Sequence, residues 1–165
     1  MPRSEPAERE VWGPSPREDF PLSVRPGFLL HKAALLMVED AEAALATIDM
    51  RARDFFVLAC LSGEPKLSQQ DLSRLLNLDP TTVVSVIDVM ERNRHVERQR
   101  DPSDRRRYHL FLTDAGRDSL VAADRAVTEA EVRFFGVLAQ DERVALRGML
   151  SQLLEGRWPA SVCED

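Results

Sequence analysis

The sequence predicts a mostly α-helical fold that carries one small two-stranded β-hairpin. Long segments repeat apolar residues at helical spacing, and two of the predicted helices are separated only by a brief turn near residue 78. After these helices, apolar residues alternate over 108–112 as they do in a strand. A short helix, a turn, a second helix and a hairpin together predict a winged helix-turn-helix, with the hairpin as the wing.

The size and composition of the chain suit one folded domain. Its 165 residues are 44% hydrophobic and 30% charged, as in globular proteins with a single core. No apolar run approaches the roughly 20 residues that cross a bilayer, and Cys60 and Cys163 lack the spacing of a disulfide framework or a metal site. We therefore expect a cytoplasmic protein with no membrane partner, no cofactor and no metal.

The first part of the chain predicts a tail followed by two helices. Residues 1–21 hold five prolines among charged residues, which predicts a flexible N-terminal arm. Recurring apolar residues predict a long helix over about 26–48. Asp49 is a candidate N-cap for a second, buried helix that contains 55–61 and ends near Gly63.

The helix-turn-helix is predicted from two capping patterns. Ser68 followed by Asp71 resembles a capping box and opens a short helix over about 68–76. Asp79 followed by Pro80 is an N-cap with proline at the first helical position, and it opens the second helix.

The second helix of this pair is predicted to run to about Asn93 with one buried side. Its apolar residues at helical spacing form a core stripe of Val83, Val86, Ile87 and Met90. The opposite, outward side then holds Thr81, Thr82, Ser85 and Asp88.

The predicted wing is basic in an acidic chain. Its strands, 96–100 and 108–112, are joined through turn-forming residues. The net charge of the chain is −6, yet the segment from Arg92 to Arg107 contains seven arginines and three carboxylates. Its net charge is therefore +4, and the rest of the chain carries −10.

A hairpin this small buries little surface, so these arginines face water or a partner. One interpretation is a solvated loop of weak ion pairs. The second interpretation is a contact between these arginines and DNA phosphates, and the preceding helix-turn-helix favours it.

Two further helices are predicted to complete the fold. Thr113 is a candidate cap for a long helix to about Ala139, and Asp141 opens a last helix that ends near Gly156, before a tail over 159–165. No glycine-rich phosphate loop, nucleophile elbow or Ser/His/Asp set occurs in the sequence. We therefore expect that the protein is not an enzyme.

The segment LSQQDLSRLLNLDPTTVVSVIDVMERN, followed by VERQRDPSDRRRYHLFLTDAGR, resembles the MarR (multiple-antibiotic-resistance regulator) family of winged-helix transcription factors. The resemblance implies a domain over 22–158, with a winged helix over about 50–112. It implies an interlocked homodimer, formed through helices at about 26–48 and 114–155. Its partner would be a pseudo-palindromic double-stranded DNA operator, with the second helix of the helix-turn-helix in the major groove and the wing in the minor groove. The implied function is sequence-specific regulation of transcription, as a repressor relieved by a small-molecule ligand.

The resemblance also implies roles for individual residues. Arg106 matches the arginine at the wing tip, and Asp104 the residue that orients it. On the helices the matching residues are Ser68 and Gln69, near phosphates, and Thr81, Thr82 and Ser85, at the base-facing start. The other wing arginines, also candidates for DNA contact, are Arg98, Arg100, Arg105 and Arg107. For Thr81 and Thr82, helix capping is the alternative interpretation.

The chain departs from the family pattern at two positions within this second helix and at one position just after it. Ser85 and Val89 stand where the family often has a basic residue, which rules out arginine readout of guanine there. Arg94 stands where the family usually has a glycine that ends the helix.

The family often binds small aromatic or anionic effectors in a cleft between the dimer helices and the winged lobe. By resemblance, His31 and Phe55 would line that cleft. The alternative for His31 is a partly exposed residue at the core edge. Cys60 is interpreted as a small buried hydrophobe rather than a redox sensor. The alternative function is a winged-helix protein-interaction module without DNA binding.

Overall fold

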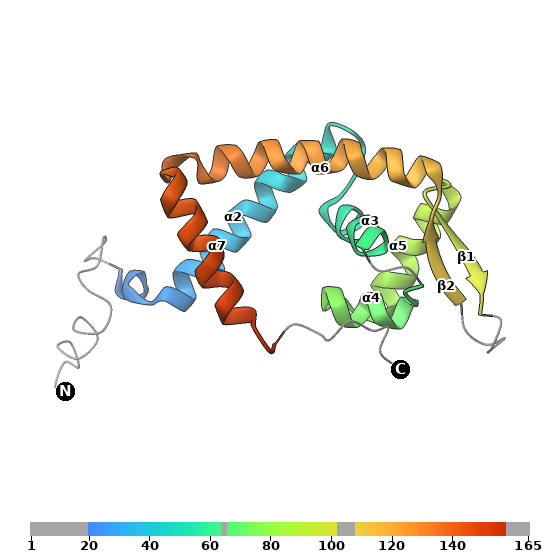
Figure 1. Ribbon diagram of the computed structural model, residues 1–165, viewed down its shortest axis with the longest axis horizontal. Coiled ribbons are helices and arrows are strands. Elements are labelled where there is room, and N and C mark those ends of the chain that lie inside the picture. Colours follow the sequence, from blue (N-terminus) through green and yellow to red (C-terminus); the bar gives the residue numbers. More distant parts are fainter. Residues whose placement is uncertain (1–19, 64–65, 102–107, 158–165) are drawn as a thin grey trace. The chain divides into compact units, whose positions relative to one another are not determined.

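The computed structural model describes residues 20–63, 66–101 and 108–157 (Figure 1). Asp104, Arg105, Arg106 and Arg107 lie outside the described residues, as do the C-terminal tail and most of the expected N-terminal arm. Contacts between Cα atoms divide the chain into two units, residues 1–40 and residues 41–165. Each unit is therefore described separately.

The first unit contains a short 3₁₀ turn and most of the first long helix. The turn η1 spans Pro21–Val24, and the helix α2 spans Pro26–Ala46, close to the expected 26–48. The rings of Phe20 and Phe28 meet edge to face, with their centroids 5.5 Å apart. Large apolar side chains are exposed along this part of α2, namely Leu29, Leu30, Leu35, Leu36 and Val38.

The second helix of the chain, α3, spans Ala52–Gly63, and its predicted N-cap was wrong. Asp49 lies in the left-handed region at φ 57°, where it ends α2 instead of starting α3. The next amide, of Met50, donates to the carbonyl of Leu45 at 3.1 Å, as in a Schellman motif. Aspartate is among the few residue types enriched in this conformation, which favours it at a helix end as well as at a start.

The helix-turn-helix and the wing are as predicted. The helices α4 (Gln69–Leu76) and α5 (Pro80–Arg92) are separated by a turn at Asn77, whose φ is 50°. The strands β1 (Val96–Arg100) and β2 (Tyr108–Leu112) pair antiparallel, with Val96 opposite Leu112 and Arg100 opposite Tyr108.

The core of the second unit lies where α3, α4, α5 and the hairpin meet. Its largest fully buried side chains come from these elements, from the end of α2 and from the residue before α4: Leu45, Val57, Leu58, Leu67, Leu72, Val83, Ile87, Val96 and Leu110. An isolated bridge between Leu67 and Leu110, with an N–O distance of 2.8 Å, ties the residue before α4 to β2. The helix-turn-helix and the wing therefore share one core.

The long helix α6 ends earlier than predicted. It spans Asp114–Phe134 and packs along α3 (Figure 1), and a 3₁₀ turn, η2 (Phe135–Val137), then separates it from α7 (Gln140–Leu154). The expectation of one helix to about Ala139 was therefore wrong. Glycine has the weakest helix propensity after proline, and the break contains Gly136.

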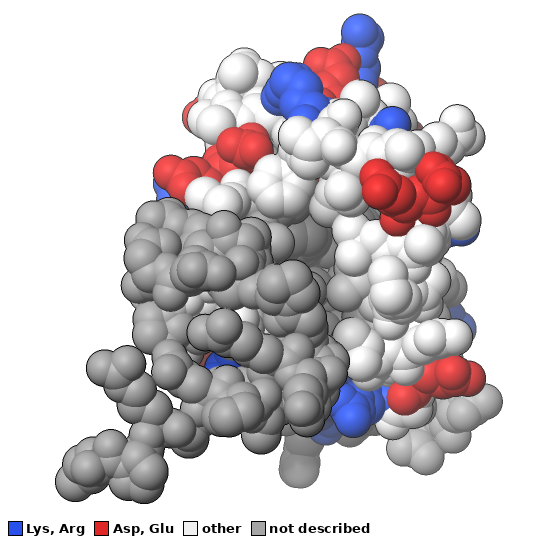
Figure 2. Space-filling view, turned by 90° about the vertical axis from the view of Figure 1, so that its left-hand side faces the viewer, with Lys and Arg blue, Asp and Glu red and all other residues white. Residues whose placement is uncertain are grey.

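The last two helices leave apolar side chains exposed. Over α6, η2 and α7 these are Val121, Val132, Val137, Val144, Met149, Leu153 and Leu154, and no residue of α7 is buried. On the side of the molecule drawn in Figure 2, uncharged side chains surround small, separate groups of acidic and basic ones. Among the described residues, no helix is both long and apolar enough to span a membrane.

Candidate nucleic-acid interface

The start of α4 is fixed by the predicted capping box. The hydroxyl of Ser68 accepts a hydrogen bond from the Asp71 amide at 3.3 Å, and the Asp71 carboxylate accepts from the Ser68 amide at 2.8 Å and from its hydroxyl at 2.6 Å. The Ser68 hydroxyl therefore donates its hydrogen to the Asp71 carboxylate. Gln69, the other predicted phosphate contact, has a buried side-chain nitrogen with no partner in the described structure.

The start of α5 is fixed by Asp79. Its carboxylate accepts from the Thr82 amide at 2.9 Å and from the Thr82 hydroxyl. These bonds, the hydroxyl first, lower the pKa of Asp79 below its usual value because they stabilise the ionised form. For Thr82, the capping alternative is therefore the one that the geometry favours.

The outward side of α5 is as the periodicity predicts. The four residues of the predicted core stripe are buried, whereas Thr81, Ser85 and Asp88 are exposed. The Ser85 hydroxyl donates to the carbonyl of Thr81 at 3.0 Å. Val84 and Val89 add two exposed apolar side chains to this side. The exposed side chains of the helix thus include hydroxyl and apolar groups, together with the carboxylates of Asp88 and Glu91 and the guanidinium of Arg92.

The C-terminus of α5 is closed by Arg94 in the position that usually takes glycine. Arg94 has φ 59°, its amide donates to the Glu91 carbonyl at 3.0 Å, and the His95 amide donates to the Met90 carbonyl at 2.8 Å. These are the two bonds of a Schellman motif. The departure from the family pattern therefore leaves the usual cap in place, built on a non-glycine residue.

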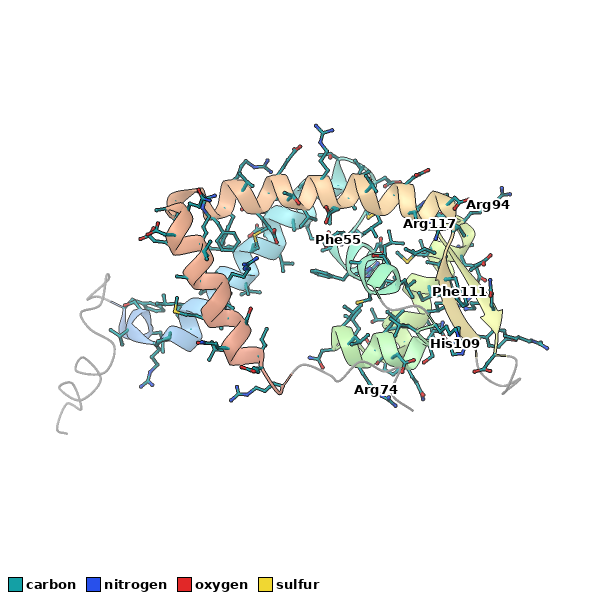
Figure 3. All side chains as sticks on the ribbon, in the orientation of Figure 1. Phe55, Arg74, Arg94, His109, Phe111 and Arg117 are labelled. Atoms are coloured by element: carbon teal, nitrogen blue, oxygen red, sulfur yellow. The ribbon has the colours of Figure 1, made fainter. Side chains whose placement is uncertain are left out.

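Hydrogen bonds and close packing connect the base of the wing to the start of α6. Thr113 caps α6 as predicted, because its hydroxyl accepts from the Gly116 amide at 3.0 Å and lies 2.5 Å from the Arg94 carbonyl oxygen. A Cβ atom on Gly116 would lie 2.0 Å from the His95 carbonyl oxygen, so only glycine fits there. Figure 3 places Arg94 and Arg117 at this junction.

The open end of the hairpin holds Arg100, the described arginine of the wing nearest the tip. Arg100 is the last residue of β1, and its Nε donates to the Tyr108 hydroxyl at 3.0 Å, with the guanidinium 5.7 Å from the ring centroid. His109 Nε2 lies 2.9 Å from an Asp101 carboxylate oxygen. Arg100 thus remains exposed at the end that leads to Arg105, Arg106 and Arg107.

Arg98 differs from Arg100, the other wing candidate that the structure describes. Its Nη2 lies 2.5 Å from Asp88 Oδ1, and its Nη1 bonds to Glu91 Oε2, so that it is paired with α5. Sequence reasoning missed this pair, although the signal was present. Side chains alternate along a strand, so Arg98 shares a side with buried Val96, and Asp88 and Glu91 are one turn apart on α5.

The two candidate effector residues lie in different units. His31 is exposed on α2. Phe55 is half-buried on α3, packs against the core, and has its ring centroid 5.6 Å from that of Phe56 (Figure 3). Burial raises the pKa of the Cys60 thiol, which disfavours the reactive thiolate and agrees with its interpretation as a small hydrophobe.

A cavity of about 460 Å³ lies inside the second unit, between the end of α2, the start of α3 and α5. Its walls combine apolar side chains with charges of both signs, from Met50, Arg51, Arg53, Asp54, Val86 and Val89 among others. Phe55 is not part of its lining. In the described part of the chain, no group of three potential metal ligands is found.

Comparison with known proteins identifies the family. The family model for the MarR family matches residues 51–108, which include α3, the helix-turn-helix and β1 and end at the first residue of β2. A putative transcriptional regulatory protein for the hcr operon of Thauera aromatica is 32% identical over 141 residues, covering 84% of this chain and 85% of that protein. The chain belongs to the MarR family. It is accordingly a transcriptional regulator. This supports the predicted regulation of transcription over the alternative of a protein-interaction module, and it agrees with the expectation that the protein is not an enzyme.

Solved structures of MarR-family proteins share the fold. The repressor CouR of Rhodococcus jostii RHA1, bound to a 23-mer DNA duplex, is 34% identical with a TM-score of 0.73, covering 80% of this chain and 94% of that one. A MarR family protein of Mycobacterium tuberculosis in complex with salicylic acid is 27% identical with a TM-score of 0.68, covering 82% of this chain and 98% of that one. The winged helix-turn-helix fold is therefore confirmed.

Proposed function

We propose that this MarR-family regulator is a cytoplasmic homodimer that represses transcription by binding a pseudo-palindromic operator. The observation that carries the proposal is the exposed side of α5. Asp79 and the Arg94 turn fix the ends of the helix, and the core stripe fixes its rotation, so Thr81 and Ser85 point outward from a rigid element. The DNA complex of CouR, at 34% identity, supports the same use of the fold.

In this proposal each element of the winged helix has one task. Thr81 and Ser85 face bases in the major groove, and Thr82 positions the helix through Asp79. Ser68 and Gln69 hold the start of α4 near a phosphate, where helix N-termini attract anions. Arg106, oriented by Asp104, enters the minor groove, and Arg100, Arg105 and Arg107 contact the backbone beside it.

The exposed apolar side chains support dimerisation through α2, α6 and α7. Burying apolar surface contributes about 25 cal/mol per Å², and exposed patches of such side chains usually mark interfaces. The proposed dimer places the two α5 helices about 34–36 Å apart, one turn of the duplex. The proposed domain covers residues 22–158. It consists of a winged helix at about 50–112 and of dimerisation helices at about 26–48 and 114–155.

The proposed effector is a small aromatic or anionic molecule that releases the operator. The salicylic acid complex of the Mycobacterium tuberculosis relative supports this class. Phe55 offers a half-buried ring for stacking, and His31 an exposed imidazole for an anion.

Selection of bound duplexes from a random-sequence pool tests the proposal. The expected result is an inverted repeat whose half-sites lie about 10 base pairs apart, bound by two chains per duplex in size-exclusion chromatography with light scattering. Matched Thr81→Ala and Ser85→Ala variants should relax the selected sequence at the half-site centre. Recovery of no consensus, or binding of one chain to a single half-site, would contradict the proposal.

A further inference from the structure

Arg98 joins the wing to α5 through two carboxylates. One terminal nitrogen of its guanidinium lies 2.5 Å from Asp88 Oδ1, and the other bonds to Glu91. The Arg98 side chain is only 23% exposed, compared with 53% for Asp88 and 42% for Glu91. The arginine is therefore more buried than the acids that it pairs with, and each of its two terminal nitrogens bonds to a carboxylate.

The two carboxylates stand in an unfavourable place for a DNA-binding protein. Asp88 lies three residues after Ser85 and seven after Thr81, so it shares their exposed side of α5. A carboxylate there would face the phosphates that the same side of the helix must approach. Repulsion between like charges across an interface weakens binding, and the field of a duplex extends this effect over about 10 Å at 0.1 M salt.

We propose that Arg98 masks the charge of Asp88 and Glu91 and acts on DNA binding only through them, without contacting DNA itself. The inference rests on the proposed function and replaces the prediction that Arg98 is a phosphate contact. An arginine suits this role because its guanidinium stays ionised and its two terminal nitrogens bond to different carboxylates. The mask would let an acidic helix segment enter the major groove.

Three variants separate charge masking from direct contact. Arg98→Met keeps the aliphatic stem and leaves both carboxylates unpaired. A triple variant, Arg98→Met/Asp88→Asn/Glu91→Gln, also removes the two negative charges at nearly constant shape. Arg51→Met removes an arginine that is paired with Glu42 at 3.2 Å and that lies outside the proposed dimerisation helices and DNA contacts, so it serves as the matched control. Each protein is titrated with the selected duplex in mobility-shift assays at several salt concentrations, and circular dichroism checks folding.

Charge masking predicts about a tenfold loss of affinity for Arg98→Met, with little change for the control. The triple variant should return to within about threefold of the wild type. It should also keep the wild-type dependence on salt, because no phosphate contact is lost. If Arg98 contacts a phosphate, the triple variant stays weak and its slope of log K against log salt falls by about 0.9.

The outcomes distinguish this inference from the proposed function. A wild-type protein that binds no duplex overturns the proposed function and the inference with it. A wild type that binds, together with an unaffected Arg98→Met variant or an unrestored triple variant, overturns the inference alone. If Arg98→Met does not fold, the triple variant still decides, because it lacks the guanidinium but is expected to bind.

Discussion

At the scale of single residues, Arg94 is a site where the chain carries conformational strain. It adopts φ 59° to close α5, although it has a Cβ atom. The left-handed conformation costs a residue with a side chain roughly 1–2 kcal/mol, whereas glycine adopts it freely. The cap bonds of His95 and Arg94 to the end of α5 come from the backbone and do not need the arginine side chain.

We therefore expect Arg94→Gly to raise the free energy of unfolding by about 1 kcal/mol. Arg94→Ala, which also removes the charge but keeps the Cβ atom, should give no comparable gain. Urea unfolding followed by circular dichroism measures both. Equal stabilities for the two variants would show that the charge, and not the backbone conformation, determines the effect.

At the scale of elements, the cap of α5 determines how well the outward side of that helix is held. The Asp79 carboxylate accepts two hydrogen bonds from Thr82, and its pKa is lowered as a result. A group with a lowered pKa in the folded state stabilises that state above its unfolded pKa of about 3.9. This stabilisation is lost as the pH falls through the lower, folded pKa.

Replacing Asp79 by alanine should lower the midpoint of thermal unfolding at pH 7 and weaken binding to the selected duplex. Asp79→Asn, which caps without ionising, should keep more of the stability at pH 7. The difference in midpoint between wild type and Asp79→Asn should shrink as the pH is lowered below about 4. A difference that is independent of pH would contradict the ionised cap.

Most elements were predictable from local chemistry. The capping residues Ser68, Asp79 and Thr113 sit beside helices that began within one residue of the expected positions, because a cap depends on only a few neighbouring residues. The core stripe of α5 followed from periodicity alone. The failures were at Asp49, which suits a helix end as well as a start, and at the 3₁₀ break after Phe134.

The candidate interface was less predictable than the fold. Which arginine faces DNA depends on pairs between separate elements, such as Arg98 on β1 with Asp88 and Glu91 on α5. Such pairs depend on how a strand packs on a helix, and this packing cannot be read directly from the sequence. The same holds for the Thr82 hydroxyl, for which capping and DNA contact were both open and whose partner is Asp79.

At the scale of the whole molecule, the exposed apolar residues of η2 and α7 indicate an interface with a partner. Val137 is 89% exposed, and Met149 and Leu153 on α7 are each 56% exposed. Monomeric proteins rarely leave extended apolar patches in water. We propose that a second copy of the chain buries these apolar side chains.

Leu153→Glu should therefore shift the protein toward monomers, because dimerisation would bury an unpaired carboxylate. Gln152→Glu, at an exposed polar position of the same helix, is the matched control because it adds the same single negative charge. Sedimentation equilibrium measures the dimer dissociation constant, expected to rise at least tenfold for Leu153→Glu. If both variants stay as dimeric as the wild type, α7 is not part of the interface.

In the proposed function, the acidic chain attracts DNA mainly through the arginines of its wing. The most direct test is the salt dependence of binding to the selected duplex for the wild type and for Arg106→Ala. The account predicts that log K falls linearly with log salt for both, with weaker binding and a slope shallower by about 0.9 for Arg106→Ala. A wild-type affinity that does not change with salt, or equal curves for the two proteins, would contradict it.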